Sequence, residues 1–491
     1  MLFNTIDFMI FFFIVVGLVA ILKYRRFQHL YIIFASFFFI YYTDNYLVAL
    51  LLYTILLHYY TGREIYKAGS KARKKIFLVL GIAGSLGLLG FFKYADFAIA
   101  QFNIFGNIVD LGSEIPLMNL ALPIGISFYS FQSISYIIDI YRGSLTPSKT
   151  LREYAFFVAF FPTLVAGPIL RAKQFLPQLR EKIEESSTTG RLRQFVIHRS
   201  NLKFGLTLMA LGFFKKMFFA DNIAPIANEI FSNPYGLESF TIILGAIAFG
   251  LQIYGDFSGY TDIAIGAALI LGFKVPQNFN FPFFATSPAE FWRRWHISLS
   301  TWVKDYVFLP LAINHKKSKL RIFFSIFTTM FLIGIWHGAG WNFIIFGIIH
   351  GLYVGIETSI RSIFPSLQNN SFLKSRFGKI ISILMTQYLI FLSFLAFRVH
   401  DLEHLLYSVQ KLIFIDLEIN EISGFILEHK LPLFLMILFL IIHFISFRNP
   451  KTLDKISNLK LTHWIIFLII IFTSIIFLYD ANPRDFIYFR F

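Results

Sequence analysis

Long apolar runs recur along almost the entire chain, and they restrict its fold more than any other feature. The 491 residues are 56% hydrophobic and only 15% charged, whereas a water-soluble domain of this size needs far more charge to cover its surface. Apolar runs of about 17–25 residues are long enough to cross a bilayer as helices. The sequence therefore predicts an all-α, polytopic integral membrane protein, and Ile6–Leu22 is interpreted as a first, retained span.

The charged residues predict how the chain is oriented. The net charge is +16, but Lys and Arg gather in short loops and acidic residues gather in the alternate ones. This pattern is typical of topology signals rather than of a nucleic-acid surface, so no nucleic-acid partner is expected. Arg63–Lys75, Arg171–Lys203 and Lys451–Lys460 are predicted to be cytoplasmic and Asp401–Glu428 to be outside, with about eleven or twelve crossings of the inner membrane in total.

Two segments are not expected to cross the membrane as single helices. Tyr154–Leu170 is apolar but contains Pro162 and Pro168, and basic residues flank it on both sides, so it is predicted to be re-entrant. Lys274–Leu320 is too polar to cross and too aromatic for a solvated loop, so it is predicted to be interfacial or partly sunken. The chain has no cysteine, which excludes disulfides, thiolate metal sites and acyl-thioester intermediates on the chain. No metal site is expected.

The first candidate cluster lies in the predicted interfacial segment. Ser287, Pro288 and Glu290 form a capping box, which predicts a helix running on to Tyr306. One face of this helix is aromatic and the opposite face is basic, with His296 on the border and Ser300 one turn later. The alternative, which the periodicity taken alone favours, is an amphipathic helix that only anchors the protein in lipid headgroups.

A second cluster, Gly334–Asn342, lies between two apolar spans. The spacing of Gly334 and Gly338 permits close helix packing, and the imidazole of His337 between glycines is expected to be sterically accessible. A neutral imidazole is the side-chain base least costly to hold in a low dielectric. The alternative is a tight interfacial turn with two membrane-belt tryptophans. His350 is interpreted as a packed polar contact.

A third cluster places two carboxylates, Asp256 and Asp262, inside an otherwise apolar span. Ionisable residues in a membrane are costly and usually functional, so these two are candidates for relaying protons or orienting a histidine. They are also candidates for ion pairs that hold helices together. Lys215 and Lys216 are the basic residues that do not fit the predicted sidedness, because they fall towards the outer end of a span.

Several segments together resemble the membrane-bound O-acyltransferase family, in matching order over nearly the whole chain. The likeness is greatest to the bacterial branch that contains the membrane subunit of alginate O-acetylation. The segments are Leu122–Phe128, Phe161–Ile169, Asp256–Tyr260, Phe291–Pro310, Trp336–Trp341 and Phe486–Phe489. The resemblance implies one membrane domain over 1–491, with N-terminal spans in 1–120, a catalytic core in 121–360 and C-terminal spans in 361–491.

The resemblance also implies an activity. His337 matches the family's essential catalytic histidine and His296 its second important one. The expected reaction moves an acyl group, most simply acetyl, from a cytoplasmic thioester such as acetyl-CoA or an acyl carrier to a hydroxyl acceptor outside. That acceptor is expected to be a polysaccharide or a partner acetyltransferase. Substrate-binding roles are expected for these residues: Arg293, Arg294, Lys304, Trp336, Asn342, Ser300 and Asp256.

No bound cofactor is expected, because the thioester is a substrate. The rival class is a multi-pass transporter or flippase, which would also use intramembrane Asp and His. The sequence contains no internal repeat of the transporter kind, which argues against that class. The acceptor itself is not specified by the sequence.

Overall fold

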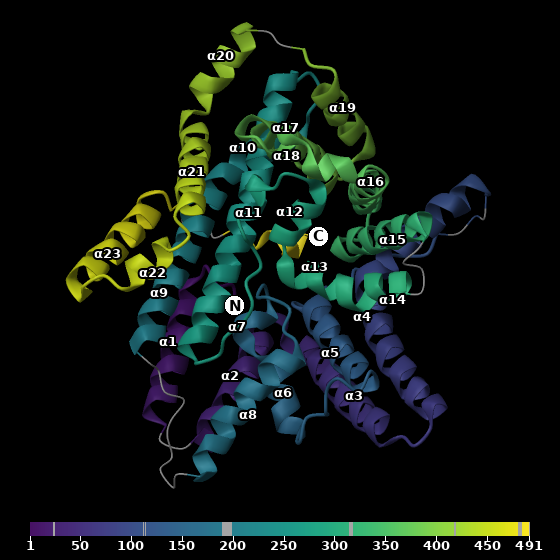
Figure 1. The fold of residues 1–491 in the computed structure, drawn as a ribbon, viewed down its shortest axis with the longest axis vertical. Helices are drawn as coiled ribbons and strands as arrows, with labels where there is room; N and C mark the ends of the chain where they lie inside the picture. Colours follow the sequence, from purple (N-terminus) through teal and green to yellow (C-terminus); the bar gives the residue numbers. More distant parts are fainter. Residues whose placement is uncertain are drawn as a thin grey trace. The chain divides into compact units, whose positions relative to one another are not determined.

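The structure is a computed structural model that describes residues 1–22, 25–110, 112, 114–188, 199–313, 318–416, 419–479 and 484–490. These residues form helices and connecting loops without any β-strand (Figure 1). Two compact units can be distinguished, one made of residues 1–209 and 263–276 and the other of residues 210–262 and 277–491. The all-α prediction is confirmed, and the single membrane domain stays a prediction.

The first unit carries the N-terminal helices. Their bounds are α1 Ile6–Ile21, α2 Arg25–Asp44, η1 Asn45–Leu47, α3 Val48–Lys67, α4 Lys71–Ile108, α5 Ile126–Tyr141, α6 Leu151–Ala159, α7 Phe161–Leu164, α8 Ala172–Thr188 and most of α9 Arg199–Phe213. Part of the predicted cytoplasmic segment Arg171–Lys203, residues 189–198, lies outside the described residues.

The predicted re-entrant segment, Tyr154–Leu170, contains no helix long enough to cross a bilayer. It comprises the end of α6, the four-residue α7 and an irregular stretch. Pro162 falls within the first two positions of α7, where its missing N–H costs no helical hydrogen bond. Every residue of the segment is buried, which agrees with non-helical backbone at membrane depth being covered by protein.

The second unit carries all the candidate site residues. Its helices are η2 Phe214–Ala220, α10 Asp221–Ser232, α11 Ser239–Ile270 up to residue 262, η3 Pro282–Phe284, α12 Pro288–Arg294, α13 Ile297–Val303, η4 Lys304–Phe308, α14 Leu309–Ala312, α15 Lys319–His337, α16 Trp341–Ile363, η6 Pro365–Asn369, α17 Ser371–Lys374, α18 Arg376–Arg398, α19 Leu402–Ile413, α20 Ile419–Glu428, α21 Lys430–Arg448, α22 Thr452–Ser457, α23 Leu461–Phe477 and η7 Ile487–Arg490.

Seven helical runs within the described residues are long and apolar enough to span a membrane. They are Gln28–Lys67, Lys71–Ile108, Ser239–Ile270, Lys319–His337, Trp341–Ile363, Arg376–Arg398 and Lys430–Arg448. The first run is 40 residues long and changes from α2 to α3 at η1, so at about 1.5 Å per residue it has the length for two crossings. Ile6–Ile21 and Leu461–Phe477 are shorter apolar helices. A polytopic membrane protein is confirmed, while the count of eleven or twelve crossings stays a prediction.

Candidate active site

The segment Ser287–Tyr306 does not form the single helix that its periodicity predicts. Ser287 is the N-cap, since the Glu290 N–H donates to its hydroxyl at 3.2 Å, and α12 starts there. The Glu290 carboxylate accepts from the N–H of Thr286, one residue before the position that a capping box uses, at 2.8 Å. The helix ends at Arg294, and α13 starts only at Ile297. Between them His296 adopts a left-handed backbone conformation, with φ of +43°. Histidine is among the residues that adopt this conformation more readily than most, and here it separates the two helices.

Asn278 holds the turn in place. Its backbone carbonyl accepts from the Ile297 N–H at 2.9 Å, and its side-chain oxygen accepts from the Ser298 N–H at 3.3 Å. Two residues later, the Asn280 N–H donates to the Arg294 carbonyl at 2.9 Å. Asn278 is fully buried, so these bonds are shielded from water. Sequence reasoning did not single out Asn278, because its partners are 19 and 20 residues away in an irregular segment.

The predicted aromatic face packs inside the protein. Trp292, Trp295, Leu299 and Trp302 are each no more than 5% exposed. The Trp292 indole N–H donates to His350 at 3.1 Å, and the Trp295 ring lies 5.6 Å from the ring of Phe394. This face is therefore covered by α16 and α18 and is not free to anchor the protein in lipid headgroups. His350 also contacts the Ser393 hydroxyl at 2.9 Å, as expected for a packed polar contact.

His337 is the last residue of α15, at the tight turn into α16. The two helices approach closely because Gly334 faces Gly347, where a Cβ on Gly334 would lie 2.6 Å from the Gly347 Cα. Gly338 leaves room for the ring of Phe343, which a Cβ there would meet at 2.1 Å. Both glycines are thus required by close packing, as their spacing predicts.

The environment of His337 differs from the open one expected from its glycine neighbours. Its side chain is only 3% exposed. The imidazole lies 4.9 Å from the ring of Phe397, 5.7 Å from Phe346 and 5.0 Å from Trp336. The expectation of a loosely packed, accessible imidazole is therefore wrong. The neighbouring glycines make space for other aromatic rings, and these rings enclose the histidine.

Tyr488 lies against both candidate histidines. Its ring is 5.7 Å from that of His337 and 6.4 Å from that of His296. Trp336 is the other shared neighbour, since it adjoins His337 in sequence and its ring is 6.0 Å from His296. The two histidines, 41 positions apart in the sequence, therefore belong to one aromatic cluster. Figure 1 shows the C-terminal end of the chain among α12, α13 and α15.

Asp256 anchors the C-terminal segment that carries Tyr488. One of its carboxylate oxygens accepts from the Ile487 N–H at 2.7 Å, and the other pairs with the Lys216 ammonium at 2.8 Å. Lys216 is 1% exposed and also pairs with Asp221 at 2.8 Å. Asp262 pairs in the same way with Lys215 at 2.6 Å. The carboxylates of the span are thus engaged with the two lysines that did not fit the predicted sidedness.

The predicted substrate-binding residues fall into two groups. Arg293 and Lys304 are exposed, and their role in donor binding stays a prediction. Lys304 also lies 4.0 Å from the Asp305 carboxylate. Besides Asp256, three more polar side chains of the set have partners within the protein. Arg294 pairs with Glu290 at 2.8 Å, the Ser300 hydroxyl donates to the Trp295 carbonyl at 3.1 Å, and the Asn342 amide donates to the Ala396 carbonyl at 3.1 Å. Substrate roles for these three stay predictions, and each has a structural contact that a variant would also remove.

The electrostatics of the site favour a neutral imidazole at His296. His296 lies between the candidate spans α11 and α15, and burial lowers the pKa of its side chain to about 3. It is therefore uncharged at neutral pH. Within the part of the chain that the structure describes, no three His, Asp or Glu side chains gather as a metal site would require. Two imidazoles in an apolar enclosure suit proton transfer and carbonyl polarisation.

Comparison with known proteins shows what the chain is similar to. A model of the membrane-bound O-acyltransferase family (MBOAT) matches residues 148–396, which include both histidines. The peptidoglycan O-acetyltransferase of Helicobacter pylori is 30% identical over 539 aligned residues that cover 100% of this chain and 98% of that protein.

Other relatives match over shorter stretches. The probable alginate O-acetylase of Azotobacter vinelandii is 42% identical over 62% of this chain and 58% of that protein. The teichoic acid D-alanyltransferase of Bacillus subtilis is 32% identical over 48% of this chain and 59% of that protein. The chain thus spans less than two thirds of the length of the alginate relative, and Tyr488 lies outside the stretch that the family model matches.

Proposed function

The chain belongs to the membrane-bound O-acyltransferase family, and from this premise we propose that it transfers an acyl group, acetyl in the simplest case, from a thioester to a hydroxyl. The observation that carries the proposal is that His337 and His296 share Trp336 and Tyr488 as aromatic neighbours. Helix ends far apart in the sequence converge there, in a place from which bulk water is largely excluded.

His337 is the general base of the proposed reaction. It removes the proton from the acceptor hydroxyl as the oxygen attacks the thioester carbonyl, forming the new C–O bond. The tetrahedral intermediate then collapses, the C–S bond breaks, and the proton leaves with the thiol. General-base catalysis of this kind typically contributes about 10²–10⁴-fold. The reaction therefore yields the ester and the free thiol, and His337 returns to its neutral form.

His296 acts on the carbonyl rather than on the hydroxyl. Because its lowered pKa keeps the ring neutral, it presents one N–H donor without bringing a charge into the enclosure. A hydrogen bond from this N–H to the thioester oxygen strengthens as negative charge develops there, which lowers the barrier. Asn278 fixes the backbone turn and so fixes the direction of the ring.

The two substrates reach the site from opposite sides of the inner membrane. The donor, acetyl-CoA or an acyl carrier, enters from the cytoplasm, where exposed Arg293 and Lys304 attract its phosphates. The acceptor is a hydroxyl of a cell-envelope or extracellular polysaccharide, or of a partner acetyltransferase, on the outer side. Support comes from the relatives, whose names describe O-acetylation of alginate and of peptidoglycan.

Release of coenzyme A from acetyl-CoA by the purified protein in detergent micelles is the direct test. A thiol-reactive dye reports the release without interference, since the chain has no cysteine. Thiol release that depends on His337 and rises with an added hydroxyl acceptor is the expected result. A protein that moves a labelled substrate across proteoliposomes without releasing thiol would instead be a transporter.

A further inference from the structure

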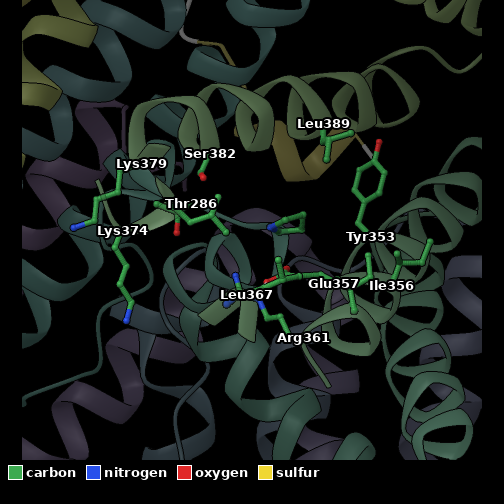
Figure 2. Close-up of a pocket in the computed structure, with 13 residues that line it drawn as sticks. Thr286, Tyr353, Ile356, Glu357, Arg361, Leu367, Lys374, Lys379, Ser382 and Leu389 are labelled. Carbon is green, nitrogen blue, oxygen red and sulfur yellow. Dashed lines mark ion pairs between the residues drawn. The ribbon is translucent and has the colours of Figure 1, made fainter. Parts of the chain in front are cut away.

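A pocket of about 620 Å³ lies in the second unit, lined by residues from the start of α12, from α16 and from η6 to α18 (Figure 2). Its volume is within the range of about 300–1,000 Å³ that is usual for ligand sites. Neither His296 nor His337 lines it. The pocket is therefore separate from the aromatic cluster around the two histidines, and it needs its own explanation.

The charge of this pocket is mainly positive. Three cations line it, Arg361, Lys374 and Lys379, against one carboxylate, Glu357. Glu357 is already occupied, since it pairs with Arg361 at 2.9 Å and accepts from the Ala289 N–H at 2.8 Å. Among the residues that the structure describes, neither Lys374 nor Lys379 has a carboxylate partner. The Lys374 ammonium donates one hydrogen bond to the Asn369 side-chain oxygen at 3.0 Å. Because an ammonium has three donors and neither charge is neutralised, both lysines can still bind an anion.

The positive charge that Glu357 does not offset lies at one end, because Arg361 is paired with Glu357. In Figure 2, Lys374 and Lys379 lie together on one side of the pocket, while Tyr353 and Leu389 lie at the opposite side. Apolar residues continue the wall, and Ile356, Ile360 and Leu373 among them are 48%, 41% and 41% exposed. A ligand that matches this arrangement has an anionic head and an apolar tail.

The position of the pocket relative to the spans points to a ligand from the membrane. It lies where α16 ends and α18 begins, and both helices are apolar enough to span. The alternation of charged loops predicts that residues 361–379 are cytoplasmic, because Asp401–Glu428 after the next span is predicted to be outside. Basic pockets between spans on the cytoplasmic side suit anionic lipid headgroups.

We propose that this pocket binds one anionic phospholipid, with its phosphate at Lys374 and Lys379 and its acyl chains along the apolar wall towards Tyr353 and Leu389. The lipid would contact the end of α16, the beginning of α18 and the beginning of α12. The beginning of α12 is included because Glu357, which lines the same pocket, accepts from the Ala289 N–H. The proposal does not depend on the acyl-transfer activity, and its test measures binding alone.

Native mass spectrometry of the delipidated, detergent-purified full chain tests the proposal. The probes are dioleoylphosphatidylglycerol, zwitterionic dioleoylphosphatidylcholine and inorganic phosphate. We expect one phosphatidylglycerol per chain, bound about tenfold more tightly than phosphatidylcholine. Lys374→Gln with Lys379→Gln should remove the preference. The matched control, Lys451→Gln with Lys455→Gln, removes two exposed lysines from another predicted cytoplasmic loop and should keep it.

A second variant tests the pocket by filling its volume while leaving its charge unchanged. Ser382 lines the pocket, and Ser382→Phe fills it without altering a cation, so it should also abolish tight phosphatidylglycerol binding. Equal binding of the two lipids, or an unchanged preference in both pocket variants, would overturn the proposal. Competition by millimolar inorganic phosphate would show a free-phosphate site, and displacement of the lipid by acetyl-CoA would show a donor site. Either result would also refute a lipid site.

Discussion

The Asp256 carboxylate accepts a 2.7 Å hydrogen bond from the backbone N–H of Ile487, which lies 231 residues later in the chain. The residue after Ile487 is Tyr488, whose ring contacts both His296 and His337. A carboxylate in the middle of an apolar span therefore determines where the C-terminal segment is held. It also connects the ion pair with Lys216 to the wall of the candidate active site.

Asp256→Ala should detach this segment. The substitution removes the acceptor for Ile487 and leaves Lys216 with one carboxylate, Asp221, and a 3.4 Å hydrogen bond to the Asp485 carbonyl. Removing one partner of a buried pair costs about 3–5 kcal/mol. We expect faster cleavage of a C-terminal tag by added protease and a large loss of thiol release. Asp262→Ala is the matched control, because it breaks a similar ion pair with Lys215 that has no contact with the C-terminal segment. Equal protease sensitivity in both variants would contradict the anchoring role.

His337→Gln should lower thiol release by at least about 100-fold while the protein remains folded. Glutamine retains most of the side-chain volume but cannot serve as a base. His337→Ala is a poorer choice, because it leaves a cavity among Phe346, Phe397 and Tyr488 and should also reduce stability. Size-exclusion chromatography and thermal melting in detergent measure the folded fraction.

The control for that experiment is His350→Gln. His350 is also a buried histidine on the α15–α16 hairpin, and its partners are Trp292 and Ser393. We expect its loss to lower the melting temperature, because two hydrogen-bonded partners are left buried, while thiol release per folded molecule stays within a fewfold of the parent. Abolished turnover in folded His350→Gln would place the base elsewhere.

Part of this site is predictable from local sequence. Ser287 and Glu290 predict the start of α12, and the spacing of Gly334 and Gly338 predicts the tight α15–α16 turn, because both signals act within a few residues. The break at His296 is not predictable in this way, since the aromatic periodicity continues across it. The hydrogen bonds that stabilise the break come from Asn278, in a segment without regular structure.

Long-range contacts explain what else sequence reasoning missed. The Phe486–Phe489 segment was noted as part of a family resemblance, but nothing local places Tyr488 between two histidines. That position depends on Asp256, 231 residues before Ile487. Asp256 and Asp262 illustrate the same difficulty, because the sequence around them is compatible both with proton relay and with ion pairing. Their partners, Lys215 and Lys216, are identified only by the packing of α11 against η2.

The sidedness of the loops is testable with single cysteines. Ala68 is only 7% exposed, whereas Gly69 next to it is exposed and a Cβ there meets nothing within 4 Å. Gly69→Cys in the predicted cytoplasmic loop should therefore react with an impermeant maleimide only after cells are opened. Ile415→Cys, at a position 62% exposed in the predicted outer loop, should react in intact cells. The opposite labelling pattern would invert the predicted orientation.

Arg293 and Arg294 are adjacent but should behave differently when replaced. Arg293 is exposed, so Arg293→Gln should raise the apparent KM for acetyl-CoA severalfold with kcat nearly unchanged, because it removes attraction common to the ground and transition states. Arg294 is paired with Glu290, and Arg294→Gln should mainly lower the melting temperature. Steady-state kinetics and thermal melting separate the two effects. An unchanged KM in Arg293→Gln would remove it from the donor site.

His296→Asn should lower kcat strongly without straining the turn, because asparagine also tolerates a left-handed backbone. Burial lowers the pKa of His296 to about 3, so this ring does not titrate above pH 5. Any acid limb in the pH–rate profile above pH 5 must then belong to another group. The residual activity of His296→Asn should show the same acid midpoint as the parent, and a shifted midpoint would mean that His296 ionises in that range.

The same pKa predicts how stability depends on pH. An unfolded histidine has a pKa of about 6.5, so between pH 3 and 6.5 the unfolded chain binds a proton at His296 that the folded chain does not. Stability therefore increases with pH through this window, and acidification destabilises the protein. His296→Asn removes the contribution, so the drop in melting temperature from pH 7.5 to pH 5 should be smaller in the variant. An equal drop in both proteins would show that His296 is not held neutral by the fold.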